Sequence, residues 1–160
     1  MEHRLYAQVV GSIMYAMLCT RSDLSFAVSL VSRFQSNPSE AHWVAIKRIL
    51  RYIKGAKNHK MTYSGKHLKV IGYSNFDFSG DTDDGKCTSG YIFLLGQGAI
   101  SWCNKKQSCV AKSTMEVECI ACSSAISEVV WIKGFLKSLN IKETPDDPIK
   151  VMGDNQAAIC

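Results

Sequence analysis

The hydrophobic period of the sequence changes once, near residue 60, and this change limits the folds open to the chain. Before it, apolar residues recur at helical spacing over residues 6–19, 22–35 and 39–55. Asn37-Pro38 ends the second of these segments, and Ser39 and Gly55 are suited to cap and to end the third. Beyond residue 60, short runs rich in β-branched and aromatic residues alternate with glycines and polar turns. The pattern predicts a helical N-terminal segment followed by an α+β part.

The second part reads as a mixed sheet with one long packing helix. Three strands separated by turn signals are predicted, in an antiparallel meander, at residues 69–76, 88–95 and 99–103. Ser113 and Glu116 stand in capping-box spacing at the head of a helix that we expect to run to about Leu139. A loop at 145–148, a fourth strand at 149–152 and a helix from Gly153 complete the predicted order.

Charge and cysteine content narrow the functional classes. Of the 160 residues, 1–60 carry nine Lys and Arg against three Asp and Glu, whereas 61–160 carry ten against eleven. We therefore expect two parts, 1–60 and 61–160, of which the first is basic.

Seven cysteines without a framework spacing favour reduced thiols and an intracellular location, and no apolar run reaches the roughly 20 residues of a membrane span. The apolar run from Val9 to Cys19 loosely resembles a signal peptide, so secretion is the less favoured alternative.

The third predicted helix has an apolar face and a basic one. Trp43, Ile46, Leu50 and Ile53 are expected to form the apolar face. The candidate nucleic-acid-binding cations lie on this helix and just beyond the third predicted strand: Lys47, Arg48, Arg51, Lys54, Lys105 and Lys106. Such a stripe is either an ordinary solvated helix face or a surface that follows a phosphate backbone.

Acidic residues mark a candidate metal site. Glu118 heads an otherwise apolar helical stripe that ends at Leu136, so it is either a half-exposed first-turn residue or a buried carboxylate with a metal, cation or donor as partner. Asp154 follows the fourth strand and is either a helix N-cap or a ligand. Asn75 and Asp77 share one face of the first strand. Convergence of these groups is what two Mg²⁺ ions require for phosphodiester hydrolysis.

Several sequence blocks resemble the copia-type retrotransposon Pol polyprotein, from the end of reverse transcriptase into ribonuclease H. They are Val10-Gly11-Ser12-Ile13-Met14-Tyr15, Thr20-Arg21-Ser22-Asp23, Ser32-Arg33-Phe34, His42-Trp43 through Lys54-Gly55, Gly72-Tyr73-Ser74-Asn75-Phe76-Asp77, Thr88-Ser89-Gly90-Tyr91, Ile100-Ser101-Trp102, Lys105-Lys106-Gln107, Ser113-Thr114-Met115-Glu116-Val117-Glu118 and Gly153-Asp154-Asn155-Gln156. The resemblance implies a helical reverse-transcriptase tail over 1–60 and a C-terminally incomplete ribonuclease H-like domain over 61–160. It also implies RNA–DNA hybrid as substrate, Mg²⁺ as cofactor and the remainder of the polyprotein as partner.

The resemblance assigns the site residue by residue. The helix Glu maps onto Glu118 and the Asp after the fourth strand onto Asp154, whereas the first-strand Asp falls at Asn75. An amide cannot supply the charge of a bridging carboxylate, and Asp77 lies roughly 6–7 Å further along the strand. The fourth acid of the family is expected beyond Cys160. We therefore expect weakened Mg²⁺ binding and little or no nuclease activity.

Other functions fit the same residues. Arg48-Ile49-Leu50-Arg51 matches the R-x-L-R pattern of secreted oomycete effectors, although copia-type chains carry a similar run. A non-catalytic nucleic-acid binder would use the same cations, and a decayed element fragment would have no selected function.

Overall fold

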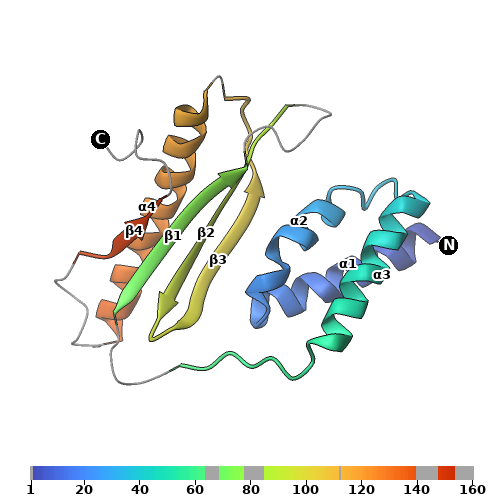
Figure 1. Ribbon diagram of the computed structural model, residues 1–160, viewed down its shortest axis with the longest axis horizontal. Coiled ribbons are helices and arrows are strands. Elements are labelled where there is room, and N and C mark those ends of the chain that lie inside the picture. The colour runs from blue at the N-terminus through green and yellow to red at the C-terminus, as the bar shows by residue number, and fades with distance from the viewer. Residues whose placement is uncertain (1, 64–68, 78–84, 112, 140–147, 154–160) are drawn as a thin grey trace. The chain divides into compact units, whose positions relative to one another are not determined.

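The chain folds into two compact units, Met1–Met61 and Thr62–Cys160. The computed structural model describes residues 2–63, 69–77, 85–111, 113–139 and 148–153 (Figure 1). The division falls one residue from the boundary expected from the change of period.

The first unit is helical. It contains α1 (Glu2–Cys19), a 3₁₀ turn (Ser22–Leu24), α2 (Ser25–Ser32) and α3 (Glu40–Gly55). The predicted helix over 22–35 is thus shorter than expected at both ends. At its end, the amides of Arg33 and Phe34 donate to carbonyls three residues back, so the helix tightens instead of continuing. As predicted, Ser39 is the N-cap of α3, and its backbone N–H donates to His42 Nδ1 at 2.9 Å.

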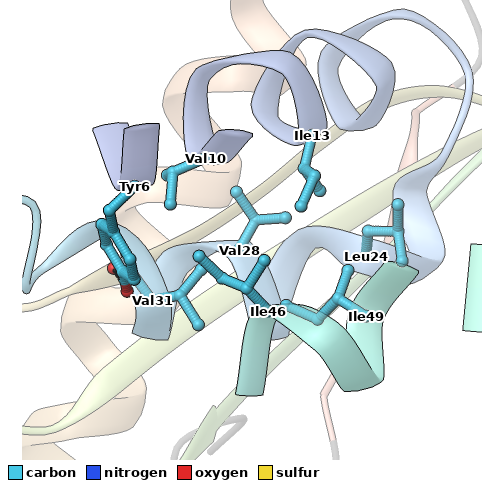
Figure 2. Close-up of a cluster of buried hydrophobic side chains, with 8 residues drawn as sticks. All are labelled: Tyr6, Val10, Ile13, Leu24, Val28, Val31, Ile46 and Ile49. Atoms are coloured by element: carbon cyan, nitrogen blue, oxygen red, sulfur yellow. Dashed lines mark hydrogen bonds between the residues drawn. The ribbon is translucent and has the colours of Figure 1, made fainter. Parts of the chain in front are cut away.

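All three helices contribute to one apolar core. Figure 2 shows its buried side chains, which come from α1, the 3₁₀ turn, α2 and α3: Tyr6, Val10, Ile13, Leu24, Val28, Val31, Ile46 and Ile49. The Tyr6 hydroxyl is also satisfied inside this core, because it donates to the Val31 carbonyl oxygen at 2.9 Å. The helical spacing of the sequence is therefore explained by packing between these helices.

The apolar face of α3 differs from the predicted one at a single position. Ile49 is buried, whereas Leu50 keeps 44% of its surface exposed. Ile46, Ile49 and Ile53 follow the i, i+3, i+7 spacing of one stripe, and Leu50 lies one residue, about 100°, beyond Ile49. The assignment of Leu50 to the core face was wrong for this reason.

A hydrogen bond to an ion-paired carboxylate attaches the 3₁₀ turn to α3. Arg21 donates to both carboxylate oxygens of Asp23 at 2.8 and 2.9 Å, and the Tyr52 hydroxyl donates to Asp23 Oδ2 at 2.8 Å. The bond from Arg21 is the main cause that lowers the pKa of Asp23 to about 2, and Tyr52 lowers it further. The Arg21 guanidinium also lies over the Tyr52 ring, 5.5 Å from its centroid.

The second unit is a four-stranded sheet covered by a helix. It contains β1 (Val70–Asp77), β2 (Thr88–Leu95), β3 (Gly98–Lys106), α4 (Thr114–Ser138) and β4 (Lys150–Met152). The sheet order is β3-β2-β1-β4, with β4 parallel to β1 and the other neighbours antiparallel. At the β2–β3 turn, Gly96 and Gln97 both have positive φ, as a two-residue hairpin turn requires. The predicted α+β class and the meander are confirmed. The loop expected at 145–148 and the helix from Gly153 lie almost wholly outside the described residues.

One face of the sheet packs on α4 through an aromatic ring and a glycine. Phe93 on β2 is fully buried with Ala125, Ile132 and Leu136 of α4. Its partner on β1 is Gly72, where an added Cβ would lie 2.4 Å from Phe93 Cε1. The ring thus occupies the volume that a side chain at position 72 would need.

By length and composition alone, α4 is apolar enough to cross a membrane. Core helices of soluble proteins meet the same criterion, and α4 lies along the sheet in Figure 1 with one face buried against β1 and β2. Its other face is partly apolar, with Trp131 and Phe135 stacked at 5.3 Å and both exposed.

Substituting Gly72 tests the packing between sheet and helix. We expect Gly72→Ala to lower the free energy of unfolding by about 1–3 kcal/mol, because the new Cβ collides with the Phe93 ring. Gly134→Ala is the matched control, since an added Cβ there meets nothing within 4 Å. This control is expected to raise stability by about 0.5–1 kcal/mol in thermal or denaturant unfolding. Equal effects of the two substitutions would contradict the described packing.

Substituting Asp23 tests the ion pair through pH. A carboxyl whose pKa is lowered on folding stabilises the protein above its unfolded pKa, near 3.8, and loses that contribution as pH falls towards about 2. We expect Asp23→Asn to be less stable than the parent chain at pH 7, by no more than about 1 kcal/mol because the pair is partly exposed. The difference should shrink between about pH 4 and pH 2, measured by thermal unfolding of both chains. A difference independent of pH would exclude the charge as its cause.

Candidate functional site

Glu118 lies in the second turn of α4 and is fully buried. The helix start places it there: Ser113 is the N-cap, and its Oγ accepts a hydrogen bond from the Glu116 backbone N–H at 3.2 Å. Glu118 then begins the stripe that continues through Ala125, Ile132 and Leu136 on the buried side of α4. Of the two interpretations of this residue, the half-exposed first-turn Glu is excluded by its burial.

The carboxylate of Glu118 faces the end of β4. An added Cβ at Gly153 would lie 3.0 Å from Glu118 Oε1, so a larger residue at 153 would press on the carboxylate. One turn along α4, burial raises the pKa of the Cys122 thiol, and the nearby charge of Glu118 raises it further. Asp154, the next candidate ligand in sequence, follows Gly153 directly and lies outside the described residues.

The first-strand candidates lie on the other face of the sheet. Ser74 and Phe76 are on the side that packs on α4, where Phe76 contacts the cluster containing Val117. Asn75 and Asp77 alternate with them and are exposed on the opposite side. Asn75 Oδ1 accepts a hydrogen bond from its neighbour's backbone N–H, that of Phe76, at 2.7 Å. The structure therefore does not bring Asn75 or Asp77 to Glu118.

The described residues supply only part of a metal site. Within the described ranges, no three His, Cys, Asp or Glu side chains lie close enough together to hold a metal ion. Glu118 offers hard carboxylate oxygens of the kind that Mg²⁺ prefers, and the chain continues from its neighbour Gly153 into a second carboxylate. Glu118 is the described residue whose carboxylate could contribute to holding such an ion.

The predicted basic residues are at the surface. Lys47, Arg48, Arg51 and Lys54 are exposed on α3. Two of them are engaged locally: Lys47 Nζ lies 3.7 Å from Glu40 Oε1, and Arg51 Nε donates to the Lys47 carbonyl oxygen at 3.3 Å. In the second unit Lys105 is exposed and Lys106 half-buried at the end of β3. These two groups belong to separate units.

Sequence reasoning missed an acid, Glu128, that joins the helix to the sheet. Glu128 on α4 accepts hydrogen bonds from Ser101 Oγ at 2.7 Å and from the Tyr91 hydroxyl at 3.3 Å. Burial, followed by the charge of Glu128, raises the pKa of Tyr91 to about 12. Ser101 and Tyr91 stand within predicted strands, but nothing in their spacing identifies a partner 27 or more residues away on a helix.

The chain is similar in sequence to the Pol polyproteins of plant transposons. It is 44% identical over 154 residues to the retrovirus-related Pol polyprotein from transposon TNT 1-94 of Nicotiana tabacum, covering 96% of this chain and 11% of that protein. It is 42% identical over 140 residues to the corresponding polyprotein from transposon RE1 of Arabidopsis thaliana, covering 87% and 10%. The chain thus spans about a tenth of the length of these two relatives.

A relative of similar length carries a different description. The chain is 42% identical over 133 residues to secreted RxLR effector protein 161 of Plasmopara viticola, covering 82% of this chain and 94% of that protein. No family model matches the chain, and no solved structure matches it.

Proposed function

Because the chain belongs to the family of retrovirus-related Pol polyproteins of transposons, we propose that it is a nucleic-acid-binding segment of such a polyprotein. In this proposal its second unit is ribonuclease H-like and hydrolyses RNA–DNA hybrid poorly or not at all. In this proposal Met1–Met61 is the helical tail of a reverse transcriptase. The remainder of the polyprotein and RNA–DNA hybrid are its partners, inside the cell and away from membranes.

The burial of Glu118 against Gly153 is the observation on which the ribonuclease H-like assignment rests. A carboxylate is costly to bury, and packing alone would favour an apolar residue at the head of this stripe. Glu118 lies beside Gly153 at the end of β4, and Asp154 is the next residue after Gly153 in the sequence. This agrees with the pair of acids that the resemblance assigns to a ribonuclease H. The order of three strands, a helix and a fourth strand agrees with it as well.

Mg²⁺ is the proposed cofactor, and Glu118 and Asp154 would hold it. When bound, the metal supplies charge stabilisation and an activated water for phosphodiester hydrolysis. The residues of this chain would contribute oxygen ligands, and the packing of α4 excludes solvent from the carboxylate of Glu118. With Asn75 in place of the first-strand acid, we expect the metal to bind weakly.

The strand side of the site explains the proposed loss of activity. On the face of β1 that packs on α4 the chain has Ser74 and Phe76, neither of which is an acid. Asn75 is neutral and lies on the opposite face, so neither its charge nor its direction suits a metal held by Glu118. We propose that hybrid is bound but not cleaved at an appreciable rate.

The cations of α3 supply the proposed binding. Lys47, Arg51 and Lys54 recur on one exposed side of a helix whose other side is in the core. A row of exposed cations neutralises successive phosphates and releases their counterions, so it binds duplexes of any sequence.

A secreted effector is the second candidate function. It is favoured by the similarity to secreted RxLR effector protein 161, because this chain covers 94% of the length of that protein. The effector-like tetrapeptide Arg48-Ile49-Leu50-Arg51 lies inside α3, where Ile49 is in the core. Fusing a reporter to the intact chain and expressing it in a secretory host separates the two functions: processed protein in the medium would favour the effector, and cell-retained protein the Pol segment.

Restoring the missing acid alone is not expected to restore hydrolysis. With Mg²⁺ and a labelled RNA–DNA hybrid, the parent chain and Asn75→Asp should both show no cleavage above background, because the carboxylate at position 75 faces away from Glu118. Glu118→Ala is the matched negative control. Robust turnover by the parent chain that is lost in Glu118→Ala would overturn the proposed impairment.

Neutralising the α3 cations tests the binding half of the proposal. The double substitution Lys47→Gln, Arg51→Gln should weaken hybrid binding and reduce the slope of log K against log salt by about 2, close to one unit for each phosphate that is no longer neutralised. Lys133→Gln with Lys137→Gln, on α4, removes the same charge and is the control. Fluorescence anisotropy between about 50 and 200 mM salt measures both. Equal slopes for the two double variants would exclude α3 as the binding surface.

A further inference from the structure

The side of α4 that faces away from the sheet carries a second regular stripe of residues. At 100° per residue, its positions fall within about 100° of one another and opposite the buried stripe of Ala125 and Ile132. All of them are exposed, and we call them the outer face: Glu116, Cys119, Ser123, Ile126, Ser127, Val130, Gly134 and Lys137. Neither the carboxylate of Glu118 nor the cations of α3 belong to this face.

Large apolar side chains are exposed at the centre of the outer face. Ile126 keeps 57% of its surface exposed and Val130 keeps 68%. The stacked rings of Trp131 and Phe135 border them. Apolar residues on both sides of α4 explain why this helix meets the length and composition criterion of a membrane span. Clustered apolar side chains at the surface are typical of an interaction site.

Small residues separate the large ones along the outer face. Ser123, Ser127 and Gly134 allow another backbone to approach, and an added Cβ at Gly134 would meet nothing within 4 Å. The Ser127 hydroxyl already donates to the Ser123 carbonyl oxygen at 3.0 Å, so a partner could cover it without leaving this donor unsatisfied. The face therefore has the relief into which the large side chains of a second helix can pack.

The charges at the two ends of the outer face select the partner helix and its direction. Glu116 lies in the first turn of α4 and Lys137 in the last, about 32 Å apart along the axis. A second α4 that runs antiparallel places its Lys137 beside Glu116 and its Glu116 beside Lys137. A parallel second copy would bring like charges together at both ends, which is unfavourable.

We propose that the outer face of α4 binds the same face of a second copy of this chain, with the two helices antiparallel. The register that pairs Glu116 with Lys137 also brings Val130 beside Ser123 of the second copy. In the same register Ile126 meets Ser127 of the second copy, so each large residue faces a small one. A two-fold axis between positions 126 and 127 relates the copies, and every contact is made twice.

The mass of the intact chain in solution tests the proposal. By light scattering or sedimentation at up to about 0.3 mM, we expect concentration-dependent dimers. Val130→Glu should weaken self-association by at least about tenfold, because two added charges would be covered in each dimer. Ser124→Glu, exposed on α4 but outside the outer face, is the matched control and should leave it unchanged. Circular dichroism checks that both variants fold.

A monomeric parent chain, or equal effects of Val130→Glu and Ser124→Glu, would overturn the proposal. Phosphatidylcholine vesicles provide the competing test, because an exposed apolar helix face can also bind lipid. A chain that is monomeric in solution but binds these vesicles, with binding lost in Val130→Glu, would replace the second copy by a lipid surface.

A charge exchange tests the direction of the two helices. Glu116→Lys alone should weaken the dimer by about tenfold, because it turns two attractions with Lys137 into repulsions. The double variant Glu116→Lys with Lys137→Glu restores opposite charges in the antiparallel pair and should recover the parent affinity. A merely structural effect of the first substitution would persist in the double variant, and that result would overturn the antiparallel pairing.

A disulfide tests the register, because Gly134 is placed beside the exposed Cys119 of the second copy. With a mild oxidant, Gly134→Cys should give a linked dimer on a non-reducing gel, and adding Cys119→Ser should abolish it. Ser124→Cys is the control, since position 124 lies about 15 Å along the axis from the position that faces Cys119. Equal yields from Gly134→Cys and Ser124→Cys would overturn the register.

This proposal and the proposed function fail separately. Hybrid binding depends on the α3 cations, none of which lies on the outer face. A chain that dimerises but does not bind RNA–DNA hybrid would contradict the proposed function alone, whereas a monomer that binds hybrid would contradict the dimer alone.

Discussion

The packing of Phe93 against Gly72 is the contact on which the second unit depends. Because position 72 has no side chain, the ring lies against β1 and still reaches Ala125 of α4. The small residues on both sides set how closely helix and sheet approach. That approach fixes the rotation of α4 on the sheet, and with it which residues of the helix are buried. Glu118 is buried at the end of β4 because it shares the stripe of Ala125 and Ile132, which pack on this ring.

The sequence predicts the parts of this fold that depend on local periodicity. The limits of β2, the N-cap and end of α3, and the span of α4 all follow from alternation, capping residues and glycine positions. The buried stripe beginning at Glu118 was predicted on the same basis. Leu50 shows where the method fails: Ile49 and Leu50 are both apolar, and only contacts with α1 and α2 determine which of them faces the core.

The candidate site was harder to predict because it depends on which face of a strand is covered. Alternation places Asn75 and Asp77 on one face, as expected, but it does not specify that α4 packs on the other. Glu128 was not identified for a related reason. It is defined by partners distant in the chain, Tyr91 and Ser101.

Both transposon Pol polyproteins and a secreted effector are similar in sequence to this chain. Residues that the fold itself requires therefore cannot decide between these two functions. Ile49 of the tetrapeptide at 48–51 is in the core of the first unit, and any protein that keeps α3 must keep an apolar residue there. The flanking arginines then complete an effector-like pattern without any need for secretion. More weight belongs to residues that packing does not require, such as a carboxylate buried at Glu118 and a row of cations on the exposed side of α3. The cations suit a phosphodiester directly and the carboxylate would suit one through a bound metal ion, and for that reason we favour the polyprotein segment over the effector.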